Sequence, residues 1–230
     1  SKTADEYTVL LQNLLMLNGY QTEPLDGAII ASVVPPLASV WKEAASRLVH
    51  GHVMVVSPGI KTGLNIKIDD PAILGADLVS SAVGALHVCS LPCIIADLGA
   101  VTKLSVLDKN GSFLGVSILA GVSISLDALS RSSALLPSVE FSQIDHVIGT
   151  NSVDSMLSGA LYGTASMLEG MVSRIEAELG QPASVLLTGR MAKAIAPYCQ
   201  LDVTINEHLP LYGLCSIYRR NEKRLRDDNK

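Results

Sequence analysis

Hydrophobic residues recur at helical spacing near the start of the chain. The pattern predicts an amphipathic helix over residues 3–18, opened by the polar residues 3–6, which resemble an N-cap, and ended by Gly19. Its apolar positions are Leu10, Leu11, Leu14, Leu15 and Leu17.

Short apolar runs then alternate with helical patterns. Residues 27–34 predict a strand, which Pro35-Pro36 stops, and residues 37–48 predict a helix. A second strand is expected over residues 52–56. A long helix is expected from Pro71, a favourable first helical residue. Its apolar residues are Leu74, Leu78, Val79, Val83 and Leu86.

The second half of the chain predicts a meander followed by a long helix. Strands are expected over residues 93–96, 103–107 and 113–118, with turns at Asp97-Leu98-Gly99 and Asn110-Gly111. A helix over residues 149–179 follows, then strands over 184–187 and 201–205, and a charged tail over 219–230 interpreted as a frayed terminus. Strands alternating with helices, together with one meander, indicate an α/β fold with a mixed sheet.

Composition excludes several classes of protein. The 230 residues are 48% hydrophobic and 17% charged, which is typical of a globular protein. A net charge of −5 argues against a nucleic-acid binder. No apolar run approaches the roughly 20 residues that span a bilayer, and no signal peptide is evident. We therefore expect a soluble, cytoplasmic protein without membrane contact, whose four cysteines are reduced thiols.

Two carboxylates are candidates for chemistry. Asp97 ends a buried strand and precedes Gly99, where open α/β sheets bind ligands and where a cation or phosphate could be held; the alternative is a simple hairpin turn. Asp77 lies between small residues on an apolar helix, where it could act as a general base; the alternative is an exposed helix face. The loop over residues 59–64 lacks the Walker spacing and is rejected as a phosphate loop.

Ordered motifs across nearly the whole chain resemble the type III pantothenate kinase family, within the actin, Hsp70 and sugar-kinase superfamily. They include Ser32-Val33-Val34-Pro35, Gly59-Ile60-Lys61-Thr62-Gly63-Leu64, Leu74-Gly75-Ala76-Asp77, Asp97-Leu98-Gly99, Ser158-Gly159-x-x-Tyr162-Gly163 and Thr188-Gly189. The resemblance implies two ribonuclease-H-like lobes with mixed sheets. These are a first lobe over residues 1–90, expected to lack its N-terminal strands, and a second over 91–218, before the tail at 219–230.

The same resemblance implies an activity and its site. The family transfers the γ-phosphate of ATP to pantothenate in coenzyme A synthesis, as a homodimer that uses Mg²⁺ and a monovalent cation, K⁺ or NH₄⁺. The catalytic base falls on Asp77, and the cation ligand falls on Asp97. Substrate contacts fall on Gly75, Ala76, Asp77, Leu78 and Ser152, and ATP contacts fall on Gly99 and Ala100.

The chain also departs from the family pattern. No Asp-x-Gly-Asn-Thr strand is present. The Arg after the base is Leu78, the Thr that contacts ATP is Ala100, and glycines of two phosphate turns are Val116 and Arg190; Ser152 replaces a Thr. Side chains at such positions obstruct the approach of an anion to the backbone. We expect an activity that is reduced or lost.

Two hypotheses remain open from the sequence. One is a working pantothenate kinase. The other is a non-catalytic paralogue that serves as a dimer or regulatory partner of an intact kinase subunit. The small residues of the helix over residues 158–179 predict a dimer interface, with ordinary intramolecular packing as the alternative.

Overall fold

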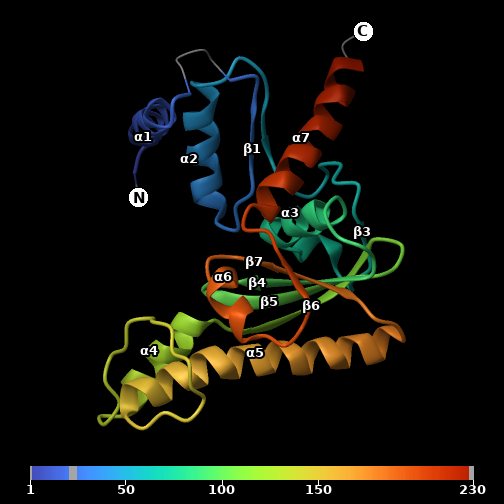
Figure 1. The fold of residues 1–230 in the computed structure, drawn as a ribbon. Coiled ribbons are helices and arrows are strands. Elements are labelled where there is room, and N and C mark those ends of the chain that lie inside the picture. The colour runs from blue at the N-terminus through green and yellow to red at the C-terminus, as the bar shows by residue number, and fades with distance from the viewer. Residues whose placement is uncertain (1, 21–24, 228–230) are drawn as a thin grey trace. The chain divides into compact units, whose positions relative to one another are not determined.

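The computed structural model describes residues 2–20 and 25–227, with side chains described up to residue 222. The chain forms two compact units (Figure 1). Unit 1 comprises Ser1–Leu64, Asp70–Gly84 and Pro210–Lys230, and unit 2 comprises Asn65–Asp69 and Ala85–Leu209. The C-terminal segment is therefore part of unit 1, whereas the expected lobes of residues 1–90 and 91–218 remain a prediction.

Unit 1 begins with two helices and a small parallel sheet. Helix α1 spans Ala4–Leu17, as predicted, and α2 spans Pro35–Ser46. Helix α2 starts two residues before its predicted position because its two prolines occupy the first helical positions, where a missing N–H costs nothing. Strands β1 (Ala28–Ile30) and β2 (Val53–Val55) pair in parallel and are shorter than expected.

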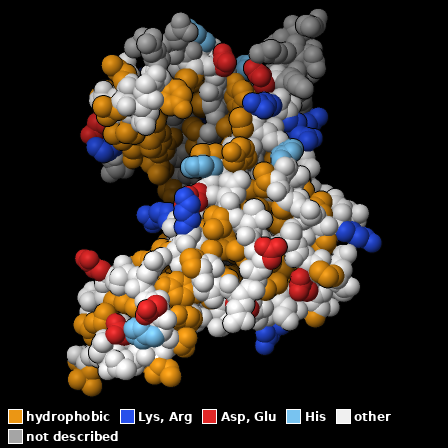
Figure 2. Space-filling model, in the orientation of Figure 1, with side chains coloured by type: hydrophobic (Ala, Val, Ile, Leu, Met, Phe, Trp, Pro, Cys, Tyr) orange, Lys and Arg blue, Asp and Glu red, His pale blue; other side chains and the backbone are white. Residues whose placement is uncertain are grey.

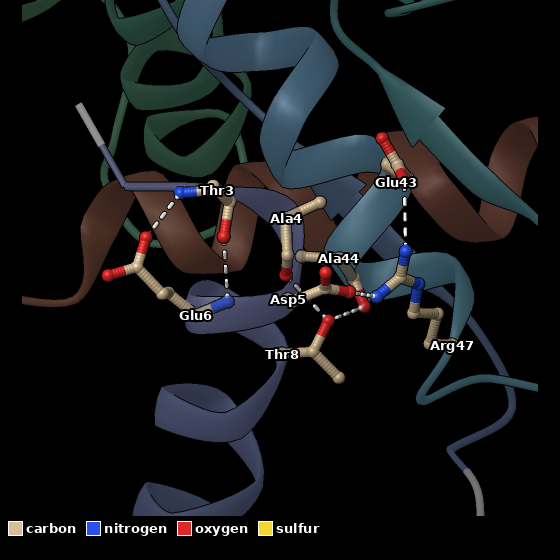
Figure 3. Close-up of polar contacts among 8 residues, drawn as sticks. All are labelled: Thr3, Ala4, Asp5, Glu6, Thr8, Glu43, Ala44 and Arg47. Carbon is tan, nitrogen blue, oxygen red and sulfur yellow. Dashed lines mark hydrogen bonds and ion pairs between the residues drawn. The ribbon is translucent and has the colours of Figure 1, made fainter.

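Polar contacts fix the start of α1 and join it to α2 (Figure 3). The Thr3 hydroxyl accepts a hydrogen bond from the Glu6 N–H, and the Glu6 carboxylate accepts one from the Thr3 N–H at 2.7 Å. This capping box confirms the N-cap expected at Thr3. Arg47 pairs with Asp5 of α1 and with Glu43 of α2, so one guanidinium ties the two helices together.

The helix expected from Pro71 is interrupted, so that prediction was wrong in length. A 3-10 turn, η1 (Pro71–Ile73), is capped by the Asp70 carboxylate, and α3 spans Ala76–Ala85. Leu74 is extended between them, with ψ of 120°, which excludes one continuous helix. The Gly75 carbonyl accepts the first hydrogen bond of α3, from the Val79 N–H.

Helix α7 (Leu209–Asp227) was missed in the sequence, and residues 219–227, expected to be frayed, are helical. Ile217 and Asn221, one turn apart, are both buried. The Asn221 amide also hydrogen-bonds both backbone groups of Lys61. The helix therefore continues into the charged segment because one of its faces packs on the loop over residues 58–64.

Unit 2 is built on a six-stranded mixed sheet in the order β3-β6-β5-β4-β7-β8. The meander β4-β5-β6 is antiparallel, as predicted, and the β3–β6, β4–β7 and β7–β8 pairs are parallel. The strands span Asn65–Ile66, Cys93–Leu98, Val101–Leu107, Ser112–Ala120, Ser184–Thr188 and Val203–Ile205 in chain order. The mixed α/β class expected from the sequence is confirmed.

Helix α5 (Ser152–Leu179) runs along one face of this sheet (Figure 1). Gly180 ends it in the left-handed conformation, with φ of 68°. Helix α4 (Val122–Ser132), which the sequence reading missed, packs against α5, and α6 (Ala192–Ile195) with the 3-10 turn η2 (Ala196–Tyr198) follows β7. The core between sheet and helices includes Ile94, Ala96, Leu98, Leu104, Leu161, Leu168 and Leu187.

Candidate active site

Asp97 is the one partly exposed residue of the otherwise buried strand β4. Successive side chains of a strand point to opposite faces. Ile94, Ala96 and Leu98 pack in the core on the α5 side, so Asp97 lies on the other face of the sheet. Gly99 and Ala100 form the turn to β5 directly after it.

Two glycines allow backbone segments to pack tightly against this turn. A Cβ at Gly121 would lie 2.2 Å from the Ala100 carbonyl oxygen, and one at Gly189 would lie 2.8 Å from the backbone of Leu98 and 2.6 Å from Asp97 Oδ1. Gly189 also has φ of +87°, a conformation that other residues rarely adopt. The sequence therefore needs glycine at both positions to hold the Asp97 turn.

A row of polar side chains crosses three adjacent strands beside Asp97. Lys103 of β5 and Thr188 of β7 are its direct partners in register, so all three side chains share a face. The Lys103 ammonium lies 2.9 Å from Asp97 Oδ2, and the two side chains are 18% and 23% exposed. The Thr188 hydroxyl is buried and has no hydrogen-bond partner among the described residues.

The second carboxylate, Asp77, lies in the first turn of α3, within unit 1. The helix dipole favours a negative charge there. A Cβ at Gly75 would meet Asp77 Oδ1 at 2.5 Å, so glycine makes room for the carboxylate. Asp77 is partly exposed, and Ala76 beside it is buried.

Ser152 is the first residue of α5 and is exposed. Its neighbour Asn151 caps the helix by accepting the Asp154 N–H at 2.9 Å. The carboxylate of Asp154 also lies 3.7 Å from His146 Nε2. The hydrogen bond to Asp145 raises the pKa of His146 above its usual value.

The substituted positions differ in exposure. Ala100 and Arg190 are exposed beside the Asp97 and Gly189 turns, and Leu78 is partly buried on α3. Val116 is partly buried on β6, opposite Ser105 of β5. The turn after Asp97 joins β4 to β5 as a hairpin, and the Gly121 and Gly189 segments close on it from other parts of the chain. A ligand site and a structural turn at Asp97 both remain predictions.

The structure brings some of the predicted site residues together. Asp97, Gly99 and Ala100 share one turn of unit 2, and Gly75, Ala76, Asp77 and Leu78 share the start of α3 in unit 1. Ser152 stands on α5, and no hydrogen bond or ion pair of the described residues joins it to the Asp97 turn.

Sequence reasoning missed the contribution of Lys103 and Thr188. A signal for Lys103 was present, because a tight turn centred on Ala100 pairs positions 97 and 103. Thr188 belongs to the Thr188-Gly189 motif of the sequence, but it could be placed beside Asp97 only once β7 was known to pair with β4. In the part of the chain that the structure describes, no three His, Cys, Asp or Glu residues form a group that could hold a metal ion.

Hydrophobic side chains gather on unit 2 over α4 and the beginning of α5, at the lower left of Figure 2. Exposed apolar residues of these two helices include Ile124, Leu129 and Val153, and the exposed Val147 and Ile148 precede α5. An open groove of about 440 Å³ lies between the end of β6, α4 and α5, and Gly159, Ala160 and Gly163 contribute to its wall. Helix α5 is therefore not wholly covered by its own unit. None of the described helices is both long and apolar enough for a membrane span.

Solved structures share the fold. The structure of a conserved protein described as a Baf family transcriptional activator from Campylobacter jejuni matches with a TM-score of 0.58 and 15% identity, covering 91% of this chain and 89% of the other. The activator of the 2-hydroxyisocaproyl-CoA dehydratase from Clostridium difficile matches with a TM-score of 0.50 and 13% identity, covering 96% and 82%. These neighbours support the actin-like ATPase fold expected from the sequence.

Sequence comparison is more specific than fold. The model of the family described as type III pantothenate kinase matches residues 1–174. The type III pantothenate kinase of Halalkalibacterium halodurans is 37% identical over 96% of this chain and 87% of its own length. The type III pantothenate kinase of Anaeromyxobacter dehalogenans is 38% identical, and the match again covers 96% of this chain and 87% of the relative. On this evidence the chain belongs to the type III pantothenate kinase family.

Proposed function

We propose that this chain phosphorylates pantothenate with ATP, the activity of coenzyme A synthesis named for its family, at a rate below that of its relatives. Asp77 carries the proposal. Its carboxylate is partly exposed at the start of α3, where the neighbouring Gly75 leaves it room. In this role Asp77 accepts the proton of the pantothenate hydroxyl as that oxygen attacks the γ-phosphate.

The Asp97 turn supports the nucleotide half of the reaction. Gly99, Gly121 and Gly189 bring three backbone segments together without side chains between them, and backbone N–H groups in such turns bind anions. Family membership implies ATP and a divalent metal as its partner. We assign the phosphates of ATP to the Gly99–Ala100 turn.

Two substitutions support the reduced rate. Leu78 replaces an arginine that would clamp the carboxylate of pantothenate, and a charge-assisted hydrogen bond contributes about 1.5–3 kcal/mol. Ala100 has no hydroxyl to offer to ATP. The loss of the clamp alone corresponds to a rate or affinity lower by roughly 10- to 150-fold.

A second candidate function is a non-catalytic partner of an intact kinase subunit. The exposed Arg190, at the position of a phosphate-turn glycine, favours it. The groove beside Gly159 and Gly163 of α5 supports self-association or pairing with such a subunit, because small residues let a second helix approach closely. We favour a homodimer through this groove for the active chain.

The experiment is a coupled assay of ADP release by the purified chain with ATP and Mg²⁺, with and without pantothenate. The kinase predicts release that depends on pantothenate and is slower by roughly 10-fold or more than that of the Halalkalibacterium halodurans relative assayed beside it. No pantothenate-dependent release, together with a changed rate of the relative when this chain is added, would establish the partner instead.

A further inference from the structure

The Asp97 carboxylate already holds a positive charge that belongs to the chain. Resemblance to the family assigns this residue to a monovalent cation, whereas the structure places the Lys103 ammonium 2.9 Å from Asp97 Oδ2. Both side chains are less than a quarter exposed, so the pair is partly shielded from solvent. Charge interactions at such a site are screened less by salt than those of a surface pair.

The pair is fixed by the sheet. Strands β4 and β5 lie in the interior of the strand order, and Asp97 and Lys103 are directly opposite each other. The Gly189 turn abuts the other carboxylate oxygen, Oδ1. Since Lys103 belongs to the adjacent strand, the register of the sheet holds its ammonium next to the carboxylate.

The residues present do not fit a second cation at Asp97. An ion bound to the same carboxylate would lie close to the Lys103 ammonium and be repelled by it. The Thr188 hydroxyl, the other polar group of the row, carries no charge to offset that repulsion. We infer that Lys103 replaces the monovalent cation in this chain, so that neither its folding nor its phosphoryl transfer requires added K⁺ or NH₄⁺.

This inference deepens the proposed function, and only its statement about rate rests on that function. Lys103 acts here as a positioning residue, because it neutralises Asp97 and thereby holds the Asp97 turn. Its effect on folding can be measured whether or not the chain turns over ATP.

The test compares thermal unfolding in KCl and in choline chloride at equal ionic strength. The wild-type chain is expected to unfold at the same midpoint in both salts, within about 1 °C. Lys103→Met keeps the aliphatic stem and frees the carboxylate. Its midpoint is expected to be higher in KCl by roughly 3 °C once K⁺ exceeds its dissociation constant tenfold. The ADP release of this variant, where the chain is active, is expected to rise with K⁺ in the same way.

Lys67→Met is the matched control, since Lys67 pairs with Asp108 at the same distance, 2.9 Å, in the same unit. It is expected to show no preference for K⁺. A midpoint of the wild-type chain that rises specifically with K⁺, or no K⁺ response in Lys103→Met, overturns the inference. If Lys103→Met does not fold, Lys103→Thr is measured in the same two salts, with the same expected and contradicting results. In either case, a wild-type midpoint that rises specifically with K⁺ overturns the inference.

Discussion

Two carboxylates of this chain each lie close to a glycine, and they stand in different elements of the fold. A Cβ at Gly75 would lie 2.5 Å from Asp77 Oδ1, and one at Gly189 would lie 2.6 Å from Asp97 Oδ1. Asp77 stands at a helix start in unit 1, whereas Asp97 is paired with Lys103 in the sheet of unit 2. Under the proposed function the two carboxylates also have different roles: Asp97 holds its turn, and Asp77 accepts the proton of the substrate hydroxyl.

The largest expected effect separates the two carboxylates by turnover. Asp77→Asn removes the proposed base and keeps its shape, so pantothenate-dependent ADP release is expected to fall by about 10²- to 10⁴-fold. Asp127→Asn, on the exposed face of α4, is the control and is expected to keep the wild-type rate. An Asp77→Asn chain with near wild-type release would show that Asp77 is not the base.

The next effect concerns the glycine beside Asp97. Gly189→Ala places a Cβ against the Leu98 backbone at a positive φ, and is expected to lower the free energy of unfolding by about 1–3 kcal/mol. Gly115→Ala on β6 is the control, because a Cβ there meets nothing within 4 Å. Denaturant unfolding measures both variants, and equal stabilities would refute the close packing of the Gly189 turn.

A smaller effect measures the ion pair itself. A double-mutant cycle with Asp97→Asn and Lys103→Met is expected to give a coupling energy of about 1 kcal/mol, the upper part of the range for opposite charges across strands. The double variant should therefore be more stable than the sum of the single losses implies. A coupling energy of zero would mean that Asp97 and Lys103 act independently.

The smallest effect is at the exposed pair His146 and Asp145, which precedes α5. The hydrogen bond to Asp145 raises the pKa of His146 in the folded chain. The stabilisation that this hydrogen bond gives to the folded state is therefore fully present below the pKa that His146 has in the unfolded chain. It is lost as the pH rises through the pKa of His146 in the folded chain. Asp145→Asn is expected to lower the titration midpoint of His146, measured by NMR of its ring protons. An unchanged midpoint would assign the raised pKa to another group, such as Asp154.

The fold was predictable where local pattern determines structure. The capping box at Thr3, the meander and the long helix over residues 152–179 follow from short-range spacing. Helix α4 was missed because its N-cap, Gly121, has no side chain that signals a helix start. Helix α7 was missed because its C-terminal part is highly charged and gives a weak local signal. The break between η1 and α3 depends on the ψ angle of a single residue, Leu74.

The site was predictable in its carboxylates and not in their environments. Asp77 and Asp97 stand out because each interrupts an apolar element in the sequence. Their partners depend on contacts distant in sequence: Thr188 and Gly189 reach Asp97 only through the pairing of β4 with β7. Lys103, six residues away, needed only the register of the hairpin.

The division of roles between the two carboxylates is tested most directly by comparing Asp77→Asn and Asp97→Asn in a single-turnover assay of ADP formation, normalised to the fraction of folded protein determined on the same samples. We predict that Asp77→Asn remains as folded as the wild type and loses the pantothenate-dependent step, and that the main effect of Asp97→Asn is a lower stability against unfolding. A stable Asp97→Asn chain that has lost turnover, beside an active Asp77→Asn chain, would contradict the account.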